Sequence, residues 1–360
     1  MDRLPHRGAS PVAGGAPVWP PPTIPAALGD RTRREGSATV KNLQDPPSEV
    51  GSDSAVTEPR RNDNDHRDGS HRQHRRKITE LLLETGEEVR ALARSPEKLA
   101  ELDALGAETV AGDVRDADYL ASTFAGADAV YTLTAFDPTL PDYHADQVRR
   151  GEAIASAIRE SGVRHVVALS SIGAELASGN GFIASLHRQE RRLRALNRVN
   201  LMILRPGAFF EGFYAALDTI RGEGVVADSV APKAKVPMIA TADIAAVAAV
   251  ALRERNWSGV VVRELLGPRD LTYTEAAAAI GVAIGQPDLQ YVQLPGEELV
   301  AILIEAAGFS PDFAVLFVEF NQALSEGRLQ SLEGRNEINT TPTEFEEFAA
   351  ELGHAYAATA

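Results

Sequence analysis

The chain has 360 residues, a formal net charge of -15 at neutral pH and no cysteine. The acidic balance argues against a nucleic-acid surface, and the lack of cysteine excludes disulfides, thiolate metal sites and a cysteine nucleophile. No apolar run approaches the length of a membrane span, and residues 1–76 contain no signal-peptide pattern. We therefore expect a cytoplasmic protein that does not cross a membrane.

Residues 1–75 differ in composition from the rest of the chain. They are rich in Pro, Gly, Ser, Arg and Asp, with a polyproline-like stretch at Val18–Pro25 and a mixed charge run at Arg60–Asp68. Such a composition cannot bury enough surface to offset its ordering entropy. The segment is therefore predicted to be a disordered tail.

A second hypothesis treats residues 1–75 as upstream DNA that has been read as protein. With Asn62 written AAT and GC-rich third positions, a shift of one base across Asn62 to Arg75 gives Met-Thr-Thr-Thr-Thr-Ala-Thr-Val-Ala-Thr-Gly-Asn-Thr-Gly. The natural protein would then start near Asn62 in the other frame, and one deleted base would join the frames before Arg76. If the tail is genuine instead, Ser37–Lys41 is a weak candidate for a strand.

From Lys77 onward, apolar strands alternate with helices. Helices are predicted over Lys77–Gly86, Ser95–Leu105 (with Ser95 as cap and Pro96 in the first turn), Ala117–Ala125, Asp142–Ser161, Ile183–Leu196 and Thr241–Leu252. Strands are predicted over Glu88–Arg94, Glu108–Gly112, Asp128–Thr134, Arg164–Ser171, Asn200–Arg205 and Gly259–Gly267. This alternation predicts a doubly wound α/β fold with a parallel sheet covered on both faces, whose strand ends meet at one rim.

Beyond Pro206 the alternation is less regular. A capping box at Thr272–Glu275 opens another helix, Gln290–Pro295 is extended, and residues 296–330 and 343–353 are predicted to be helical. We expect a smaller, mostly helical C-terminal lobe that closes one side of the cleft.

The chain enters this pattern at a helix, without the strand and glycine-rich turn that should precede it. In a dinucleotide-binding fold the first helix begins where a Gly-x-x-Gly-x-x-Gly turn ends, and its N-terminus holds the pyrophosphate. Here His71–Arg76 precedes the predicted helix. Loss of the turn removes the amide donors for a pyrophosphate, so the chain as written is potentially inactive.

Several strand ends carry residues suited to a dinucleotide. Arg94 can accommodate the 2′-phosphate of NADP, assisted by Lys98, although a solvated Arg is the simpler alternative. Asp113 can accept from the adenine amino group while Val114 packs on the ring; a turn Asp is nearly as plausible. Thr132, Leu133 and Thr134 end the fourth strand of the expected fold, near the ribose, and Ser170 lies at the end of the strand where hydride chemistry would occur.

A short-chain reductase needs a tyrosine acid and a lysine four residues later. The segment after Ser171 contains neither residue up to Glu190. His187 and Glu190 lie on the helix where the lysine would be, and His187 is a weak catalytic candidate, with a paired surface His as the alternative.

An aromatic segment follows Pro206. Gly207 allows close backbone approach, and Phe209, Phe210 and Phe213 offer an apolar wall beside a nicotinamide, with Phe210 and Phe213 as substrate contacts. Core aromatics are the alternative for at least one of them. Glu211 is either a site carboxylate or solvated.

Taken together, the motifs over roughly residues 76–350 resemble the NmrA-like branch of the atypical short-chain dehydrogenase/reductases. The resemblance rests on their order and spacing: Val89–Arg94, Gly112–Asp116, Val166–Ser171, Leu204–Gly207 with Phe209, Thr241–Ala245 and Thr341–Thr343.

The resemblance implies a Rossmann-type NAD(P)-binding domain, mainly residues 76–235, with a substrate lobe over 236–350 and a tail at 351–360. It implies NADP, or NAD, at Arg94, Asp113, Val114, Thr132–Thr134, Ser170 and Phe209, and Pro206 is also predicted to contact the cofactor. One expectation is an oxidoreductase that passes hydride from NADPH to a small flat acceptor such as a quinone. Another is a non-enzymatic redox sensor that binds a regulatory protein. A monomer or homodimer is expected.

Overall fold

The computed structural model describes residues 69–135 and 137–358. Within them, parallel strands form the two separate sheets of the Rossmann-type core. The first pairs β1 (Arg90–Ala93) with β2 (Glu108–Ala111). The second has the order β3-β4-β5-β9 and consists of Ala129–Thr132, His165–Leu169, Asn200–Pro206 and Val260–Leu265.

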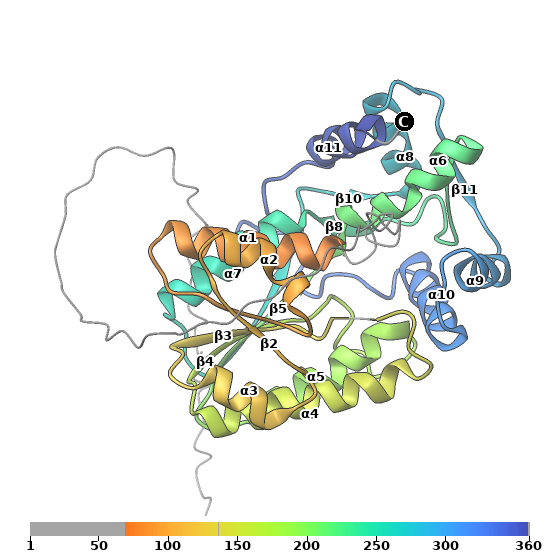
Figure 1. The fold of residues 1–360 in the computed structure, drawn as a ribbon. Coiled ribbons are helices and arrows are strands. Elements are labelled where there is room, and N and C mark those ends of the chain that lie inside the picture. The colour runs from red at the N-terminus through yellow and green to blue at the C-terminus, as the bar shows by residue number, and fades with distance from the viewer. Residues whose placement is uncertain (1–68, 136, 359–360) are drawn as a thin grey trace, which may run out of the picture. The chain divides into compact units, whose positions relative to one another are not determined.

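Helices cover both faces of these strands (Figure 1). α1 (Gly69–Glu84) and α7 (Thr241–Glu254) pack against each other on one face, and α3 (Ala117–Phe124), α4 (Tyr143–Ser161) and α5 (Ala184–Arg194) lie on the other. Each face has its own core of buried aliphatic side chains. This arrangement confirms the predicted α/β fold with a parallel sheet.

Local sequence signals explain where several helices start and stop. The Asp116 carboxylate accepts from the backbone N–H groups of Asp118 and Tyr119 and so caps α3. Asp142 caps α4 in the same way, through the amide of Ala145, and Gly162 ends that helix at a positive φ of 74°.

The C-terminal region forms a lobe with its own core and two small sheets, β10-β8-β6 and β11-β7. The predicted capping box at Thr272 is present. The lobe elements are β6 (Ala208–Phe209), η4 (Phe210–Ala216), α6 (Leu217–Glu223), β7 (Val225–Asp228), β8 (Val236–Ile239), β10 (Asp270–Leu271), α8 (Tyr273–Ala283), β11 (Gln290–Gln293), α9 (Gly296–Glu305), α10 (Pro311–Ser325) and α11 (Phe345–Ala358).

Two of the sequence motifs that are far apart along the chain meet at the boundary of this lobe. Asp243, in the first turn of α7, accepts from the backbone amide and the hydroxyl of Thr343, at 3.1 and 2.8 Å. Thr341 donates its amide to the carbonyl of Leu266, at 2.7 Å, at the end of β9. The segment before α11 is thereby fixed to the Rossmann-type core.

Three local predictions were wrong. α1 begins at Gly69, about two turns before the expected start at Lys77. The helix over Ser95–Leu105 is a short 3-10 turn, η2 (Pro96–Lys98), followed by α2 (Ala100–Ala104), and the Ser95 side chain makes no cap bond. The helical stretch 296–330 is interrupted after Glu305, because Ser310 and Pro311 start a new helix whose cap is Ser310.

Other predictions concern residues that the structure does not describe. They include the candidate strand Ser37–Lys41, the polyproline-like stretch and most of the segment 1–75. No helix in the described ranges is long and apolar enough to span a membrane.

Candidate functional site

A cavity of about 960 Å³ lies between β1 and β3. Both strands line it along their whole length, through Val89–Arg94 on one side and Ala127–Leu133 on the other. α1 contributes Ile78 and Leu82, and α3 contributes Leu120 and Phe124. The C-terminal ends of the two strands therefore open onto one shared space, as the rim of a parallel sheet requires.

Five of the predicted cofactor residues line this cavity. Arg94 is exposed at the end of β1, and its guanidinium lies 3.6 Å from the carboxylate of Asp137. Lys98 follows on η2, so two cations stand at the strand end where the 2′-phosphate of NADP was predicted. The full set is Arg94, Lys98, Val114, Thr132 and Leu133.

Asp113 and Thr134 do not line the cavity. The carboxylate of Asp113 is exposed and accepts from the backbone amide of Arg115 at 2.9 Å, which is the geometry of a turn Asp. This is the alternative that the sequence left open. Thr134 is partly buried two residues beyond the end of β3.

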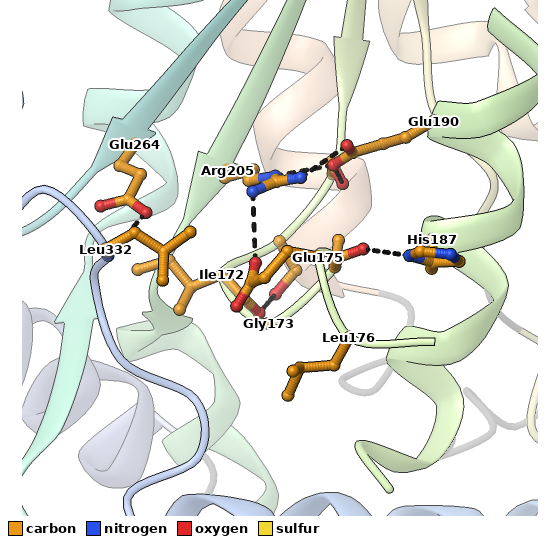
Figure 2. Close-up of polar contacts among 12 residues, drawn as sticks. Ile172, Gly173, Glu175, Leu176, His187, Glu190, Arg205, Glu264 and Leu332 are labelled. Carbon is orange, nitrogen blue, oxygen red and sulfur yellow. Dashed lines mark hydrogen bonds and ion pairs between the residues drawn. The ribbon is translucent and has the colours of Figure 1, made fainter. Parts of the chain in front are cut away.

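Ser170 belongs to a buried ionic cluster at the ends of β4 and β5 (Figure 2). Its hydroxyl donates a hydrogen bond to Glu190 at 2.6 Å. The Arg205 guanidinium donates two hydrogen bonds to the Glu190 carboxylate, at 2.8 and 2.7 Å. Arg205 also reaches Glu175 at 3.2 Å. Sequence reasoning missed Arg205 and Glu175, although an arginine within an otherwise apolar strand was a usable signal.

The cluster is electrostatically satisfied. Burial raises the pKa of Glu190, but the hydrogen bonds from Arg205 and Ser170 outweigh it and hold the pKa below its ordinary value. The charged carboxylate of Glu190 is thus paired with the guanidinium of Arg205. At the helix position where a short-chain reductase carries its lysine, this chain has a buried ion pair and no proton donor of that kind.

His187 stands one helical turn before Glu190 on α5. Its Nδ1 lies 2.9 Å from the carbonyl oxygen of Ala174, which fixes the ring on the loop after β4 (Figure 2). The side chain is half-buried. Across the same region, Glu264 accepts from the amide of Leu332 at 3.0 Å and ties the segment after α10 to β9.

The aromatic segment after β5 is placed largely in the core. Phe210 and Phe213 are 1% and 6% exposed and pack against Phe345, with ring centroids 5.1 and 5.4 Å apart. The structure thus favours the core alternative for these two predicted substrate residues. Pro206 is buried at the end of β5, and Phe209 is half-buried against the core beneath α7.

A chain of polar contacts that the sequence did not reveal runs beside the N-terminal part of α1. The His74 ring lies 3.2 Å from the carbonyl oxygen of Thr241 through Nδ1 and 2.5 Å from the Tyr131 hydroxyl through Nε2. Thr241 in turn donates its amide, at 2.8 Å, and its hydroxyl, at 2.5 Å, to Glu211. Burial raises the pKa of Glu211, and its second carboxylate oxygen is buried without a hydrogen-bond partner.

The described residues fit one end of NADP and not the other. Arg94 and Lys98 suit a phosphorylated ribose, and Val114 offers an apolar contact for a base. The pyrophosphate needs free amides at the start of the first helix. Here α1 extends back to Gly69, so the amides before Arg76 lie within the helix, and His74 occupies its inner face. Among the residues that the structure describes, the region before Arg76 therefore offers no pyrophosphate cradle.

Comparison with known proteins places the chain in context. The sequence model of the NmrA-like family matches residues 73–349. An NAD(P)H azoreductase from Xenophilus azovorans is 30% identical over 221 residues, which cover 61% of this chain and 73% of that protein. A (4-alkanoyl-5-oxo-2,5-dihydrofuran-3-yl)methyl phosphate reductase from Streptomyces griseus is 29% identical over 284 residues, or 78% and 95% of the two chains.

Among solved structures, the fold is similar to an NADPH-dependent quinone oxidoreductase from Escherichia coli in complex with NADPH. The TM-score is 0.66 at 22% identity, over 78% of this chain and 96% of that one. This likeness supports the fold assignment, including the helical C-terminal region.

Proposed function

Because this chain belongs to the NmrA-like family, we propose that it is an NADPH-dependent reductase of a small, flat acceptor such as a quinone. The observation that carries the proposal is the convergence of Arg94, Lys98, Val114, Thr132 and Leu133 on one cavity at the strand ends. The relatives named above support it, since their names describe NAD(P)H-dependent or reductive activities.

The two cations at the end of β1 favour NADP over NAD. A guanidinium forks onto phosphate oxygens, and an arginine at this strand end accommodates a 2′-phosphate, where an acidic residue would bond the ribose hydroxyls instead. We therefore propose NADPH as the donor and NADH as the poorer substitute.

The acceptor is proposed to be electrophilic enough to take hydride without a dedicated protein acid. Ser170 donates to Glu190, Glu190 is paired with Arg205, and His187 is held by Ala174, so the groups near this rim are engaged in structural contacts. Quinones and related compounds meet that requirement, whereas simple ketones need an acid to protonate the oxygen.

A second function, a sensor of NAD(P) redox state that binds a regulatory protein, is favoured by the same observation. A committed Glu190–Arg205 pair in place of a proton donor is compatible with binding without turnover. Both functions need the dinucleotide to bind. Each therefore requires a pyrophosphate site, which the described start of α1 does not provide.

NADPH consumption followed at its absorbance maximum, with a panel of quinones, azo dyes and simple ketones, tests the proposal. We expect turnover with quinones above the acceptor-free rate, faster with NADPH than with NADH, and none with ketones. NADPH binding without turnover on any acceptor would favour the sensor and contradict the reductase.

The assay needs two proteins because of the mismatch at α1. One is the 360-residue chain. The other starts at the Met of the shifted frame and joins this sequence at Arg76. If only the second protein turns over, the pyrophosphate cradle is what the given chain lacks. If neither turns over nor binds NADPH, both functions are refuted.

A further inference from the structure

The exposed face of α5 is lined with arginines. Arg188, Arg191 and Arg194 follow one another at three-residue spacing and are exposed, as is Arg198 in the turn after the helix. The pair of Arg194 with Glu190, at 3.3 Å, is the only ion pair that these arginines make with residues that the structure describes. Because Glu190 is buried, it neutralises little of this surface. We call these arginines the arginine stripe, which is a positive surface on a chain whose net charge is -15.

α9 and α10 carry the opposite charge. Residues 296–326 contain no lysine or arginine. On α10, Asp312, Val315 and Glu319 lie along one face, because they are three and four residues apart. Asp312 is exposed, Glu319 is half-buried and Val315 is 56% exposed. We call these residues of α10 the acidic face. The other acids of the range are Glu297, Glu298, Glu305 and Glu326.

η3 (Gly181–Ile183) holds α10 at the start of α5. This short turn leads directly into α5 and packs against α10. Gly181 allows the close approach, since a Cβ atom at its position would lie 2.1 Å from the carbonyl oxygen of Leu316. The same turn places Phe182 against Phe313 of α10, with ring centroids 5.7 Å apart. The arginine stripe and the acidic face therefore belong to two helices that are packed together through η3 (Figure 1).

His144 on α4 marks the boundary between the two charged surfaces. Burial lowers the pKa of His144, and the charge of Arg188 lowers it further. The charges of Asp312 and Glu319 act on the same pKa in the opposite direction. One imidazole is thus close enough to interact with a cation of α5 and with two carboxylates of α10. The positive and the negative surface therefore adjoin each other near this side chain.

We propose that the arginine stripe and the acidic face form a two-fold symmetric interface, in which α5 of each copy of this chain binds α10 of a second copy. A two-fold axis near the shared boundary exchanges the two surfaces, so a single rotation forms both contacts and closes the assembly at two copies. The exposed Val315 side chain adds an apolar contact inside a charged rim, which is a common arrangement of protein interfaces.

The charges favour a second copy of this chain over other partners. Two α5 helices cannot pair with each other, since their arginines would then face like charges. A polyanion such as DNA would meet the arginine stripe but also the acidic face beside it, on a chain with a net charge of -15. A second copy offers acids to the stripe and arginines to the acidic face at the same time. The interface does not depend on the proposed reductase activity, because it can be tested with no dinucleotide present.

Analytical ultracentrifugation of the full chain over a range of concentrations is the first test. We expect a monomer–dimer equilibrium without larger species. The dimer should be about tenfold weaker at high than at low sodium chloride concentration, because salt screens exposed charges. A chain that stays monomeric at about 0.1 mM, a dimer whose affinity ignores salt, or an open-ended polymer would overturn the proposal.

Charge reversals on the two surfaces show which helices meet. The stripe variant is Arg188→Glu/Arg191→Glu, and the α10 variant is Glu319→Arg/Gln322→Arg, which leaves intact the bond of Asp312 with the Tyr143 amide. Each variant alone should be monomeric, because its α5 and α10 no longer carry opposite charges. An equimolar mixture should dimerise again, since the acidic α5 of one variant meets the basic α10 of the other. A mixture that stays monomeric would refute the contact.

A reversal on the opposite face of the core is the matched control. Arg76→Glu/Lys77→Glu on α1 changes the net charge by the same amount as the stripe variant and should leave the dimer unchanged. An equal loss of dimer in the control would mean that net charge alone governs association, and would contradict the interface. Fluorescence anisotropy with a labelled DNA duplex checks the other partner. DNA binding by a monomeric chain, lost in the stripe variant, would assign the stripe to nucleic acid and overturn the proposal.

Discussion

The two parallel sheets of the Rossmann-type core differ in how completely their side chains are buried. In β4 and β5 almost every side chain is buried, and Val166, Val167, Ile203 and Leu204 have no exposed surface. In β1 only Ala91 and Ala93 are buried, no residue of β2 is buried, and the buried core beside them is limited to Ala91, Ala93, Leu99 and Ala107. The difference follows from neighbours: β4 and β5 are each paired on both edges, whereas β1 and β2 share one ladder. Within the described residues, strands that are paired on both edges are thus more completely buried than strands that are paired on one.

The largest expected effect is in the core of the four-stranded sheet. Ile203→Ala should lower the free energy of unfolding by about 4 kcal/mol, because it removes a fully buried side chain and leaves a cavity. Val110→Ala in β2 should cost under about 1 kcal/mol, since Val110 is partly exposed. Urea unfolding measures both, and equal losses would contradict the contrast between the sheets.

An ion pair in each sheet sharpens the comparison. Glu190→Gln leaves Arg205 buried with a weakened partner and should cost about 3 kcal/mol. Glu108→Gln weakens an exposed pair with Arg90 and should cost under about 1 kcal/mol. Urea unfolding midpoints at neutral pH measure both losses of stability. A larger loss for Glu108→Gln than for Glu190→Gln would contradict the expected difference between the two ion pairs.

The Glu190 pair also predicts a pH dependence. Because the folded pKa of Glu190 lies below its ordinary value, its contribution is present above that ordinary value and is lost as the pH falls through the folded pKa. The stability difference between the unaltered chain and Glu190→Gln should therefore shrink in acid, below about pH 4.5. A difference that stays constant down to pH 2 would show that the carboxylate is not charged in the folded state.

At the β1 end, Arg94→Ser should change ligand preference more than stability. In the protein joined to the shifted-frame strand, we expect NADP+ affinity to fall about tenfold and NAD+ affinity to stay unchanged, since the side chain would contact the 2′-phosphate alone. Arg90→Ser, at the other end of the same strand, is the control. An equal fall for NADP+ and NAD+ would remove Arg94 from the phosphate site.

The smallest effect is expected at Glu211, which links the lobe to α7. Burial raises its pKa in the folded state, so its contribution is full below the ordinary pKa and is lost as the pH rises through the folded value. Glu211→Gln should keep the acceptor for Thr241 and gain about 0.5 kcal/mol at pH 8 relative to pH 4. Thermal melts at both pH values measure this difference in stability. A gain at pH 4 relative to pH 8 would contradict the prediction.

The sequence was informative where the signal was local. The capping box at Thr272, the helices predicted over Ala117–Ala125 and Asp142–Ser161, and the apolar runs of β4 and β5 all lie close to their predicted positions. The strand-end positions of Arg94 and Thr132 followed from the predicted strands Glu88–Arg94 and Asp128–Thr134.

What the sequence did not reveal depends on partners distant along the chain. The Arg205–Glu190 pair joins a strand to a helix, and the Asp243–Thr343 bonds span 100 residues. The short strand β8 (Val236–Ile239) forms ladders with β6 and β10 of the lobe. No turn signal in the sequence marks this strand. The early start of α1 reflects helix-forming residues before Arg76, where the family resemblance implied a turn.

The most direct test of the account is calorimetric titration of NADP+ into two proteins, the given chain and the one that carries the shifted-frame strand before Arg76. We expect saturable binding to the second protein, tighter for NADP+ than for NAD+, and at least tenfold weaker binding to the first. A completed protein that folds cooperatively yet releases no heat with either dinucleotide would contradict it.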